Sequence, residues 1–298
     1  MTVESYCLVA TRRATLPIRL HYELHGHGPK RVLLIMGLSC SGEYWLPQAK
    51  FLSQQGYQVC FFDNRGVGQS DAPKGYYTTK DMALDTIELL EHLGWESDVH
   101  VVGVSMGGMI ALELASARPQ CIASLSLTST HAGSTLPPLT GALTLPRLMF
   151  TSDINKRIEM NCNLLYPKKW LDMPHPNGSG QTNREAVANS MVERIVRSPV
   201  QTSAGAIGQL SAVMRHSVGR DRLERIRSAG IPVLVCTGTE DNLVRPSNSQ
   251  FLAETLDARF EVFEGCGHAI SMQEPERYNQ MLLDHIRASS GDTASDLS

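Results

Sequence analysis

The sequence predicts an α/β protein with a doubly wound, mostly parallel β-sheet, helices on both faces and an inserted helical cap. Short, continuously apolar segments alternate with amphipathic segments long enough to be helices. This is the pattern of strands buried on both faces and joined by helical crossovers. The alternation stops between residues 131 and 219, where Gly, Pro and helical patterns replace the buried-strand pattern, and then resumes.

The first part of the chain opens with a hairpin and continues as strand–helix units. Two strand-like segments, residues 6–10 and 18–25, flank a turn near residues 11–15. The following elements are expected in the order strand 32–36, helix 44–54, strand 59–62, helix 79–93, strand 99–102, helix 109–115 and strand 122–127.

The last part repeats the pattern with strand 233–236, helix 247–256, strand 259–263 and helix 274–287. Residues 1–130 and 220–288 are therefore expected to form the core, and residues 131–219 a helical cap with helices at 154–165 and 184–197. Ligands of open parallel sheets bind beyond the carboxyl ends of the strands, so we expect the cap to act as a lid there. The small, polar residues 289–298 are predicted to form a disordered tail.

The composition, with 42% hydrophobic and 19% charged residues, is that of a soluble globular enzyme. The 298 residues carry a formal net charge of −3, which gives no electrostatic reason to expect nucleic acid or an anionic membrane as a partner. No basic segment followed by an apolar stretch opens the chain, and no run approaches the roughly 20 apolar residues of a membrane span. The seven scattered cysteines lack metal-ligand spacing. We expect a cytoplasmic protein without a metal site or integral membrane association.

The segment Gly103-Val104-Ser105-Met106-Gly107 lies where an apolar strand gives way to a helical pattern. A strand that turns sharply into a helix leaves little room for side chains around the turn, which favours the flanking glycines. The residue between them is pushed outward with its hydroxyl exposed, as in a nucleophile elbow. Ser105 is therefore the candidate nucleophile.

A serine hydroxyl needs a base, and the base needs an acid that fixes its tautomer. Asp241 follows the strand at 233–236, and His268 follows the strand at 259–263. Both lie just beyond carboxyl ends of strands, at the sheet edge that presents Ser105. Asp241 also suits a turn or helix cap, and Glu240 is the rival acid. We favour Asp241 because it lies further from the strand end, where the loop can turn toward His268.

An oxyanion formed at a substrate carbonyl requires backbone N–H donors. Met106, which follows the nucleophile near the positive end of a helix, is expected to supply one. Leu38, in the loop after the strand at 32–36, is expected to supply the second. The alternative is that this loop only joins a strand to a helix.

The chain from Ser5 to about Ala288 resembles the α/β-hydrolase fold superfamily, in its serine esterase/lipase-like branch with a helical cap. The resemblance is carried, in order, by Met36-Gly37 with Trp45, the segment 63–70, Gly103 to Gly108, Gly238-Thr239-Glu240-Asp241 and Gly267-His268. It implies an eight-stranded sheet and a Ser105–His268–Asp241 triad with no metal or organic cofactor. Most members of that superfamily carry His-Gly where this chain carries Met36-Gly37. The Leu38 donor is expected to remain, without any hydrogen bond that such a histidine would make.

The predicted function is hydrolysis of a carboxylic ester of small to medium size and moderate hydrophobicity, through an acyl-enzyme intermediate. Leu136, Leu148 and Met149 are candidate pocket residues, although they would equally well pack the cap against the sheet. Two alternatives remain: a receptor-like binding protein with slow or no turnover, and acyl transfer or C–C bond hydrolysis by the same triad. The sequence does not indicate an oligomeric state.

Overall fold

A computed structural model describes residues 2–133 and 135–290, except for the side chains of Met149 and Phe150. Its eight strands form one sheet in the order β1-β2-β4-β3-β5-β6-β7-β8. The first two strands and the β2–β4 pair are antiparallel, and the remaining neighbours are parallel. The strands are β1 (Thr2–Val9), β2 (Ile18–His25), β3 (Lys30–Ile35), β4 (Tyr57–Phe62), β5 (Val99–Val104), β6 (Ile122–Thr128), β7 (Val233–Gly238) and β8 (Arg259–Phe263).

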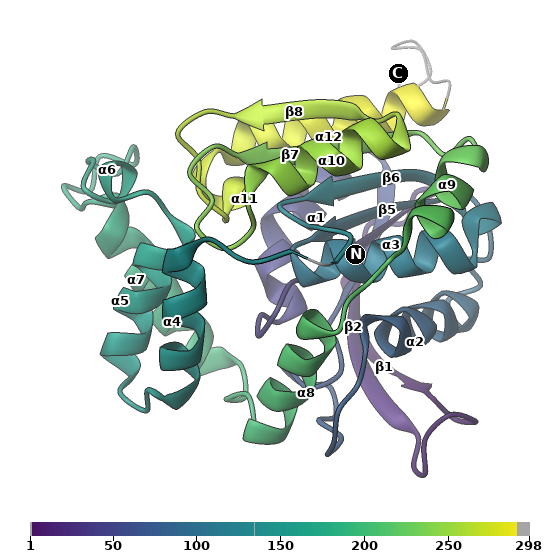
Figure 1. The fold of residues 1–298 in the computed structure, drawn as a ribbon, viewed down its shortest axis with the longest axis horizontal. Helices are drawn as coiled ribbons and strands as arrows, with labels where there is room; N and C mark the ends of the chain where they lie inside the picture. The colour runs from purple at the N-terminus through teal and green to yellow at the C-terminus, as the bar shows by residue number, and fades with distance from the viewer. Residues whose placement is uncertain (1, 134, 291–298) are drawn as a thin grey trace.

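Helices cover both faces of the sheet (Figure 1). On one face, α1 (Leu46–Gln54) and α12 (Pro275–Ser290) bury Trp45, Leu52 and Tyr278 against the strands. On the other face, a second apolar core forms under α2 (Thr79–His92), α3 (Met106–Ala117), α9 (Arg220–Ser228) and α10 (Pro246–Leu256). Burial on both faces explains why the central strands are almost wholly apolar.

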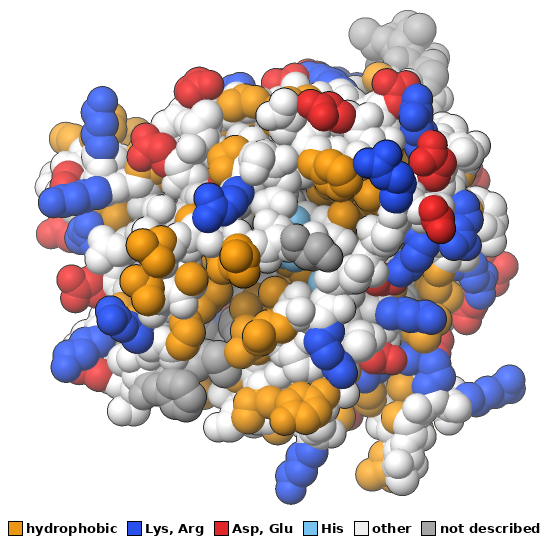
Figure 2. Space-filling model, viewed as in Figure 1, with side chains coloured by type: hydrophobic (Ala, Val, Ile, Leu, Met, Phe, Trp, Pro, Cys, Tyr) orange, Lys and Arg blue, Asp and Glu red, His pale blue; other side chains and the backbone are white. Residues whose placement is uncertain are grey.

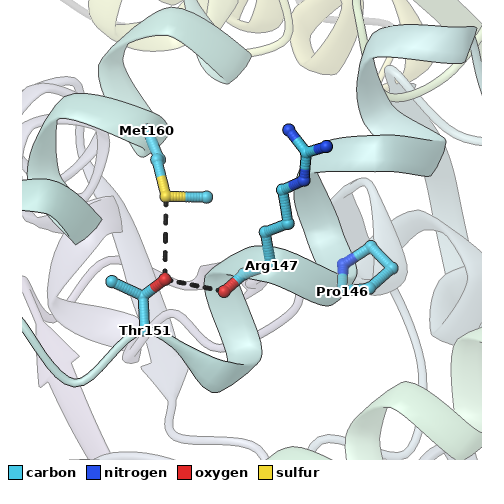
Figure 3. A pocket seen from close by; sticks show the side chains of 4 residues that line it. All are labelled: Pro146, Arg147, Thr151 and Met160. Carbon is cyan, nitrogen blue, oxygen red and sulfur yellow. Dashed lines mark hydrogen bonds between the residues drawn. The ribbon is translucent and has the colours of Figure 1, made fainter.

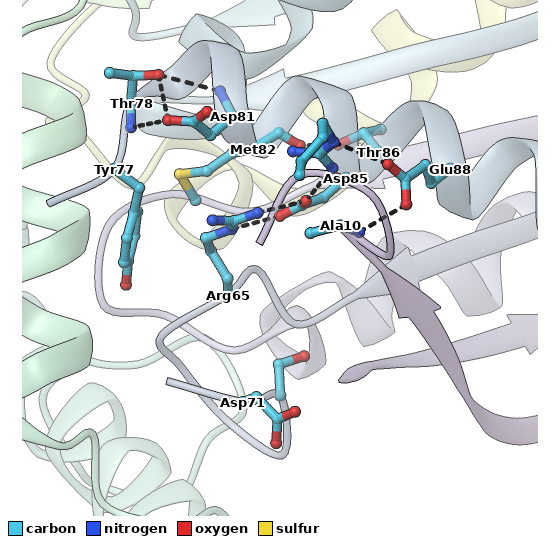
Figure 4. A network of polar contacts seen from close by, with 12 residues as sticks. Ala10, Arg65, Asp71, Tyr77, Thr78, Asp81, Met82, Asp85, Thr86 and Glu88 are labelled. Carbon is cyan, nitrogen blue, oxygen red and sulfur yellow. Dashed lines mark hydrogen bonds and ion pairs between the residues drawn. The ribbon is translucent and has the colours of Figure 1, made fainter. Parts of the chain in front are cut away.

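A polar network fixes the loop after β4 to the start of α2 (Figure 4). Thr78 and Asp81 form a reciprocal capping box that starts α2. One turn later, Asp85 accepts two hydrogen bonds of 2.5 Å from Arg65 and one of 2.7 Å from Arg13. Burial raises the pKa of Asp85, although the two arginines oppose this shift. The network therefore holds the segment that follows β4 against the first turns of α2.

The helical segment between β6 and α9, which we call the cap, consists of α4 (Leu139–Phe150), α5 (Ile154–Leu165), α6 (Lys168–Leu171), α7 (Asn183–Arg197) and α8 (Ser203–Met214). Figure 1 shows α4, α5 and α7 as a lobe beside the end of the sheet toward which the arrowheads of β6 and β8 point. The lobe has a small core of its own, which includes Ile158, Cys162 and Met191. Its two connections to the sheet meet at Gly133 and Ser217 in an antiparallel bridge.

The predicted fold class is confirmed, and several element boundaries differ; β1, for example, begins at Thr2 and α3 at Met106. The helix expected from residue 44 begins as a 3₁₀ turn, η1 (Gly42–Trp45), and α1 starts only at Leu46. Pro47 lies in the first turn of α1, where a missing N–H is tolerated. At the other end of the chain, α12 continues to Ser290, so residues 289 and 290 are helical and not part of a tail. Residues 291–298 lie outside the described part of the chain.

A short 3₁₀ turn, η2 (Pro119–Cys121), precedes β6, and a four-residue helix, α11 (Ile270–Gln273), precedes α12. Across the described ranges, none of the helices is both long and apolar enough to cross a bilayer. The division of the chain at residues 130 and 220 stays a prediction.

Candidate active site

Ser105 occupies a sharp turn between β5 and α3. Its backbone angles are φ +54° and ψ −120°, a conformation that non-glycine residues adopt only when the surrounding structure holds them in it. Here the Ser105 N–H donates to Thr128 O at 2.9 Å, and the Thr130 hydroxyl donates to Ser105 O at 2.8 Å. A Cβ atom at Gly103 would overlap Gly107 O, which explains the glycine spacing around the turn.

Asp241 and His268 form a buried pair. Asp241 Oδ2 lies 2.8 Å from His268 Nδ1, and the two side chains are 0% and 8% exposed. The other carboxylate oxygen accepts the N–H groups of Leu243 and Val244 at 2.8 and 2.9 Å. Since an ionised carboxylate only accepts hydrogen bonds, the Nδ1 atom carries a proton and Nε2 of a neutral imidazole is free to take another. The rival acid, Glu240, is exposed.

The loop that carries His268 is held by side chains and by the cap. Gln273 accepts the Gly267 N–H at 3.0 Å and donates to Gly265 O at 2.9 Å. The His268 N–H donates to Leu165 O, at the end of α5, at 2.9 Å. Sequence reasoning missed Gln273, because no local pattern distinguishes it from other polar residues beside a short helix.

Ser105, Asp241 and His268 follow the carboxyl ends of β5, β7 and β8, which with β6 are neighbours in the sheet. The strand ends are aligned, as shown by the pairing of Val104 with Thr128 at the ends of β5 and β6. Within the described residues, no hydrogen bond joins Ser105 Oγ to His268. The structure thus brings the acid and the base into contact and presents the serine at the same edge of the sheet.

The loop after β3 reaches Ser105. A Cβ atom at Gly37 would lie 3.2 Å from Ser105 Cβ, closer than ordinary van der Waals contact. The next residue, Leu38, has an N–H without a hydrogen-bond partner among the residues that the structure describes. Met106 is the first residue of α3, so its N–H has no acceptor within the helix. The role of both N–H groups as oxyanion donors stays a prediction, and neither has a hydrogen-bond partner in the described part of the chain.

Two side-chain amides hold this loop, and the sequence pattern pointed to neither role. Asn64, which is 1% exposed, donates from Nδ2 to Met36 O at 2.9 Å. Gln209, from α8, accepts the Ser39 N–H at 2.8 Å. Asn64 lies in a glycine-rich segment that the sequence singles out, whereas nothing local marks Gln209.

The candidate pocket residues of the cap differ in how far their side chains are exposed to solvent. Leu136 is 79% exposed, Leu148 is half-buried, and the side chain of Met149 lies outside the described part. A hollow of about 490 Å³ opens between α4 and α5, and its described lining consists of Pro146, Arg147, Thr151 and Met160 (Figure 3). Hydrophobic side chains gather on this side of the molecule (Figure 2). The exposed hydrophobic side chains of the cap include those of Leu136, Leu143, Val196 and Val200.

Comparisons with known proteins agree with this fold. The family model described as the alpha/beta hydrolase fold matches residues 30–275. The chain is 29% identical to the "Putative carbamate hydrolase RutD" of Stutzerimonas stutzeri (strain A1501), over 93% of this chain and 100% of that protein. It is 31% identical to the protein of the same name from Variovorax paradoxus (strain S110), over 90% of this chain and 96% of that one.

Among solved structures, a thermophilic esterase from Thermogutta terrifontis has the same fold. Its TM-score is 0.76 at 24% identity, and the match covers 97% of this chain and 99% of the esterase. The family-model match and the 31% identical relative show to which family the chain belongs, and the eight-stranded sheet agrees with them. The chain belongs to the α/β hydrolase fold family and is classed with its hydrolases.

Proposed function

We propose that this protein is a serine hydrolase that cleaves carboxylic esters, with Ser105 as nucleophile, His268 as general base and Asp241 as the acid that orients it. One observation carries the proposal: the buried 2.8 Å contact between Asp241 Oδ2 and His268 Nδ1. This contact leaves Nε2 to accept a proton, at the sheet edge where the elbow presents Ser105.

The chemistry follows from these positions. Ser105 Oγ attacks the ester carbonyl carbon while His268 Nε2 takes its proton, and the N–H groups of Leu38 and Met106 stabilise the oxyanion. The bond to the leaving alcohol breaks, and the imidazolium returns the proton to the leaving oxygen. Water, deprotonated by the same imidazole, then attacks the acyl carbon. The bond from this carbon to Ser105 Oγ breaks, the imidazolium returns its proton to Oγ, and the carboxylic acid is released. Asp241 stays ionised throughout and stabilises the imidazolium.

The second candidate substrate class is a carbamate. The observation that favours it is the near full-length similarity to two relatives whose names specify carbamate hydrolysis. A carbamate carbonyl lies between an oxygen and a nitrogen, so the same attack and proton transfers apply. Donation from nitrogen makes this carbonyl less electrophilic, so turnover of a carbamate would depend more strongly on the oxyanion donors.

The first experiment compares wild type with Ser105→Ala on p-nitrophenyl esters of increasing acyl length. We expect the substitution to lower kcat/KM by about a thousandfold or more, because the nucleophile is lost. A fluorophosphonate probe should label the wild type and not the variant. Equal hydrolysis by both proteins would remove Ser105 from the mechanism. A folded wild type that neither turns over nor labels would indicate the receptor-like alternative.

The second experiment separates the two substrate classes with one leaving group. A dedicated ester hydrolase is expected to release one p-nitrophenol per active site from p-nitrophenyl N-methylcarbamate and then stop, because the carbamoyl-enzyme is slow to react with water. A carbamate hydrolase continues through many turnovers.

All seven cysteines are free thiols, which supports the proposed reducing, cytoplasmic location.

A further inference from the structure

Gln209 is a fully buried glutamine, and both the oxygen and the nitrogen of its side-chain amide form hydrogen bonds. It is 0% exposed, although it belongs to a cap helix. Its Oε1 accepts the Ser39 N–H at 2.8 Å and Gln201 Nε2 at 3.2 Å. Its Nε2 donates to Arg65 O at 2.9 Å. One side chain therefore joins the loop after β3, the loop after β4 and the cap.

Close packing of α8 brings this side chain within reach. Gly205 lies against Gly66, and a Cβ atom at Gly205 would overlap Gly66 O. One turn further on, a Cβ at Gly208 would overlap the ring of Tyr77, whose hydroxyl donates to Gly205 O at 3.3 Å. These two small residues thus allow α8 to approach the segment that follows β4.

The contact with Ser39 bears on the orientation of the Leu38 N–H. This N–H belongs to the peptide unit between Gly37 and Leu38. Asn64 holds the preceding peptide unit through Met36 O, and Gln209 holds the following one through the Ser39 N–H. A planar peptide between two fixed neighbours has little freedom to rotate. Without one of these contacts, the flexible Gly37 would let the Leu38 N–H turn away from Ser105.

The Met36 side chain cannot replace the Asn64 contact, because a thioether has no hydrogen to donate, and its sulfur is only a weak acceptor for an N–H group such as that of Ser39. We infer that Gln209 is a positioning residue of the oxyanion hole, through which the cap controls the orientation of the Leu38 N–H. The inference rests on the proposed function, since it assigns Leu38 its role in the same reaction. It makes the cap part of the catalytic machinery as well as a cover for the substrate.

The test replaces Gln209 with leucine, which removes the amide and keeps much of the volume. We expect kcat for a p-nitrophenyl ester to fall about ten- to a hundredfold, as for a misplaced catalytic group, with KM changed less than twofold. Affinity for a trifluoromethyl ketone, which adds to Ser105 and forms an oxyanion, should weaken by a similar factor. A purely structural role would lower the melting temperature and leave both readouts unchanged.

Gln48 provides the matched control. It is also 0% exposed, but it lies in α1 and donates to Asn279 at 3.0 Å. Gln48→Leu should reduce thermal stability and leave kcat at the wild-type value. If Gln209→Leu does not fold, Gln209→Asn, which is one methylene too short to reach Ser39, takes its place with the same expected loss of kcat.

The outcomes separate the two claims. Activity that persists in Ser105→Ala refutes the proposed function. An inactive Ser105→Ala beside a Gln209 variant with wild-type kcat and ketone affinity refutes only the role of Gln209.

Discussion

At the scale of single residues, the choice between two adjacent carboxylates defines the proposed chemistry. Asp241 is buried against His268, whereas Glu240 is exposed beside it. Asp241→Asn replaces an acceptor with an amide that can donate to Nδ1, which favours the tautomer with a proton on Nε2. That tautomer cannot act as a base toward Ser105. We expect kcat to fall by about 10⁴-fold.

Glu240→Gln is the control, and we expect its kcat to stay within about twofold of wild type because its side chain is exposed. Both variants are assayed with the same p-nitrophenyl ester after their folding is verified by circular dichroism. A larger loss in Glu240→Gln than in Asp241→Asn would contradict the assignment of the acid.

The difference between these residues and the supporting glutamines shows what the sequence can predict. Ser105, Asp241 and His268 could be proposed from the sequence because each follows a recognisable strand, and parallel strands present their carboxyl ends at one edge. Gln209 contacts Ser39 across 170 positions of the chain, and Gln273 binds backbone atoms of a loop. Such contacts depend on the packing of α8 and α11, which periodicity does not specify.

At the scale of elements, the loop after β3 is limited by its closeness to the elbow. Gly37→Ala would place a methyl group 3.2 Å from Ser105 Cβ and 3.3 Å from Val104 O, so the loop must shift. We expect kcat to fall about tenfold or more with little change in KM, because the shift moves an oxyanion donor. Gly219→Ala, where a Cβ would meet nothing within 4 Å, should leave kcat unchanged. Steady-state kinetics on one ester decides; equal kcat in the two variants would contradict this view of the loop.

The junction of α2 with the loop after β4 allows a test of stability. Asp85 is 2% exposed and pairs with Arg65, which is 8% exposed. The raised pKa of Asp85 shows that burying the carboxylate is costly, but removing its charge leaves Arg65 buried without a counter-charge. We expect Asp85→Asn to lower the free energy of unfolding by about 3 kcal/mol.

The control for Asp85 is Glu91 on the same helix, whose ion pair with Arg118 is exposed on both sides. Glu91→Gln should change the free energy of unfolding by about 1 kcal/mol or less. Urea denaturation of both variants gives the comparison, and similar losses would show that burial does not determine the cost.

At the scale of the whole molecule, two histidines, one half-buried and one buried, join the two connections of the cap. His131 lies in the outgoing connection and His216 in the returning one, with ring centroids 5.7 Å apart. His216 Nε2 lies 3.1 Å from His131 O, and Nδ1 lies 2.8 Å from the Thr79 hydroxyl. Because a carbonyl only accepts, Nε2 carries the proton and Nδ1 accepts from Thr79, which is the arrangement of a neutral imidazole.

Burial lowers the pKa of His216 to about 3 and that of His131 to about 4. Glu113 lies 3.9 Å from His216 Nδ1 but is already paired with Arg222. In the unfolded chain a histidine has a pKa near 6.5, so between about pH 6.5 and these lower values the unfolded state binds more protons. The free energy of unfolding therefore falls as the pH falls through this window, by up to about 1.4 kcal/mol per pH unit for each histidine.

His216→Gln tests this linkage, because a glutamine amide can donate to His131 O in place of Nε2 and does not titrate. Between pH 6 and pH 4.5, we expect the free energy of unfolding of the variant, measured by urea denaturation, to depend on pH less steeply than that of wild type. The expected difference is about 1 kcal/mol per pH unit. His27→Gln, at an exposed position, should keep the wild-type slope. Equal slopes in all three proteins would mean that His216 takes up a proton in the folded state as readily as in the unfolded chain. In that case the connection between cap and sheet would not depend on a neutral imidazole.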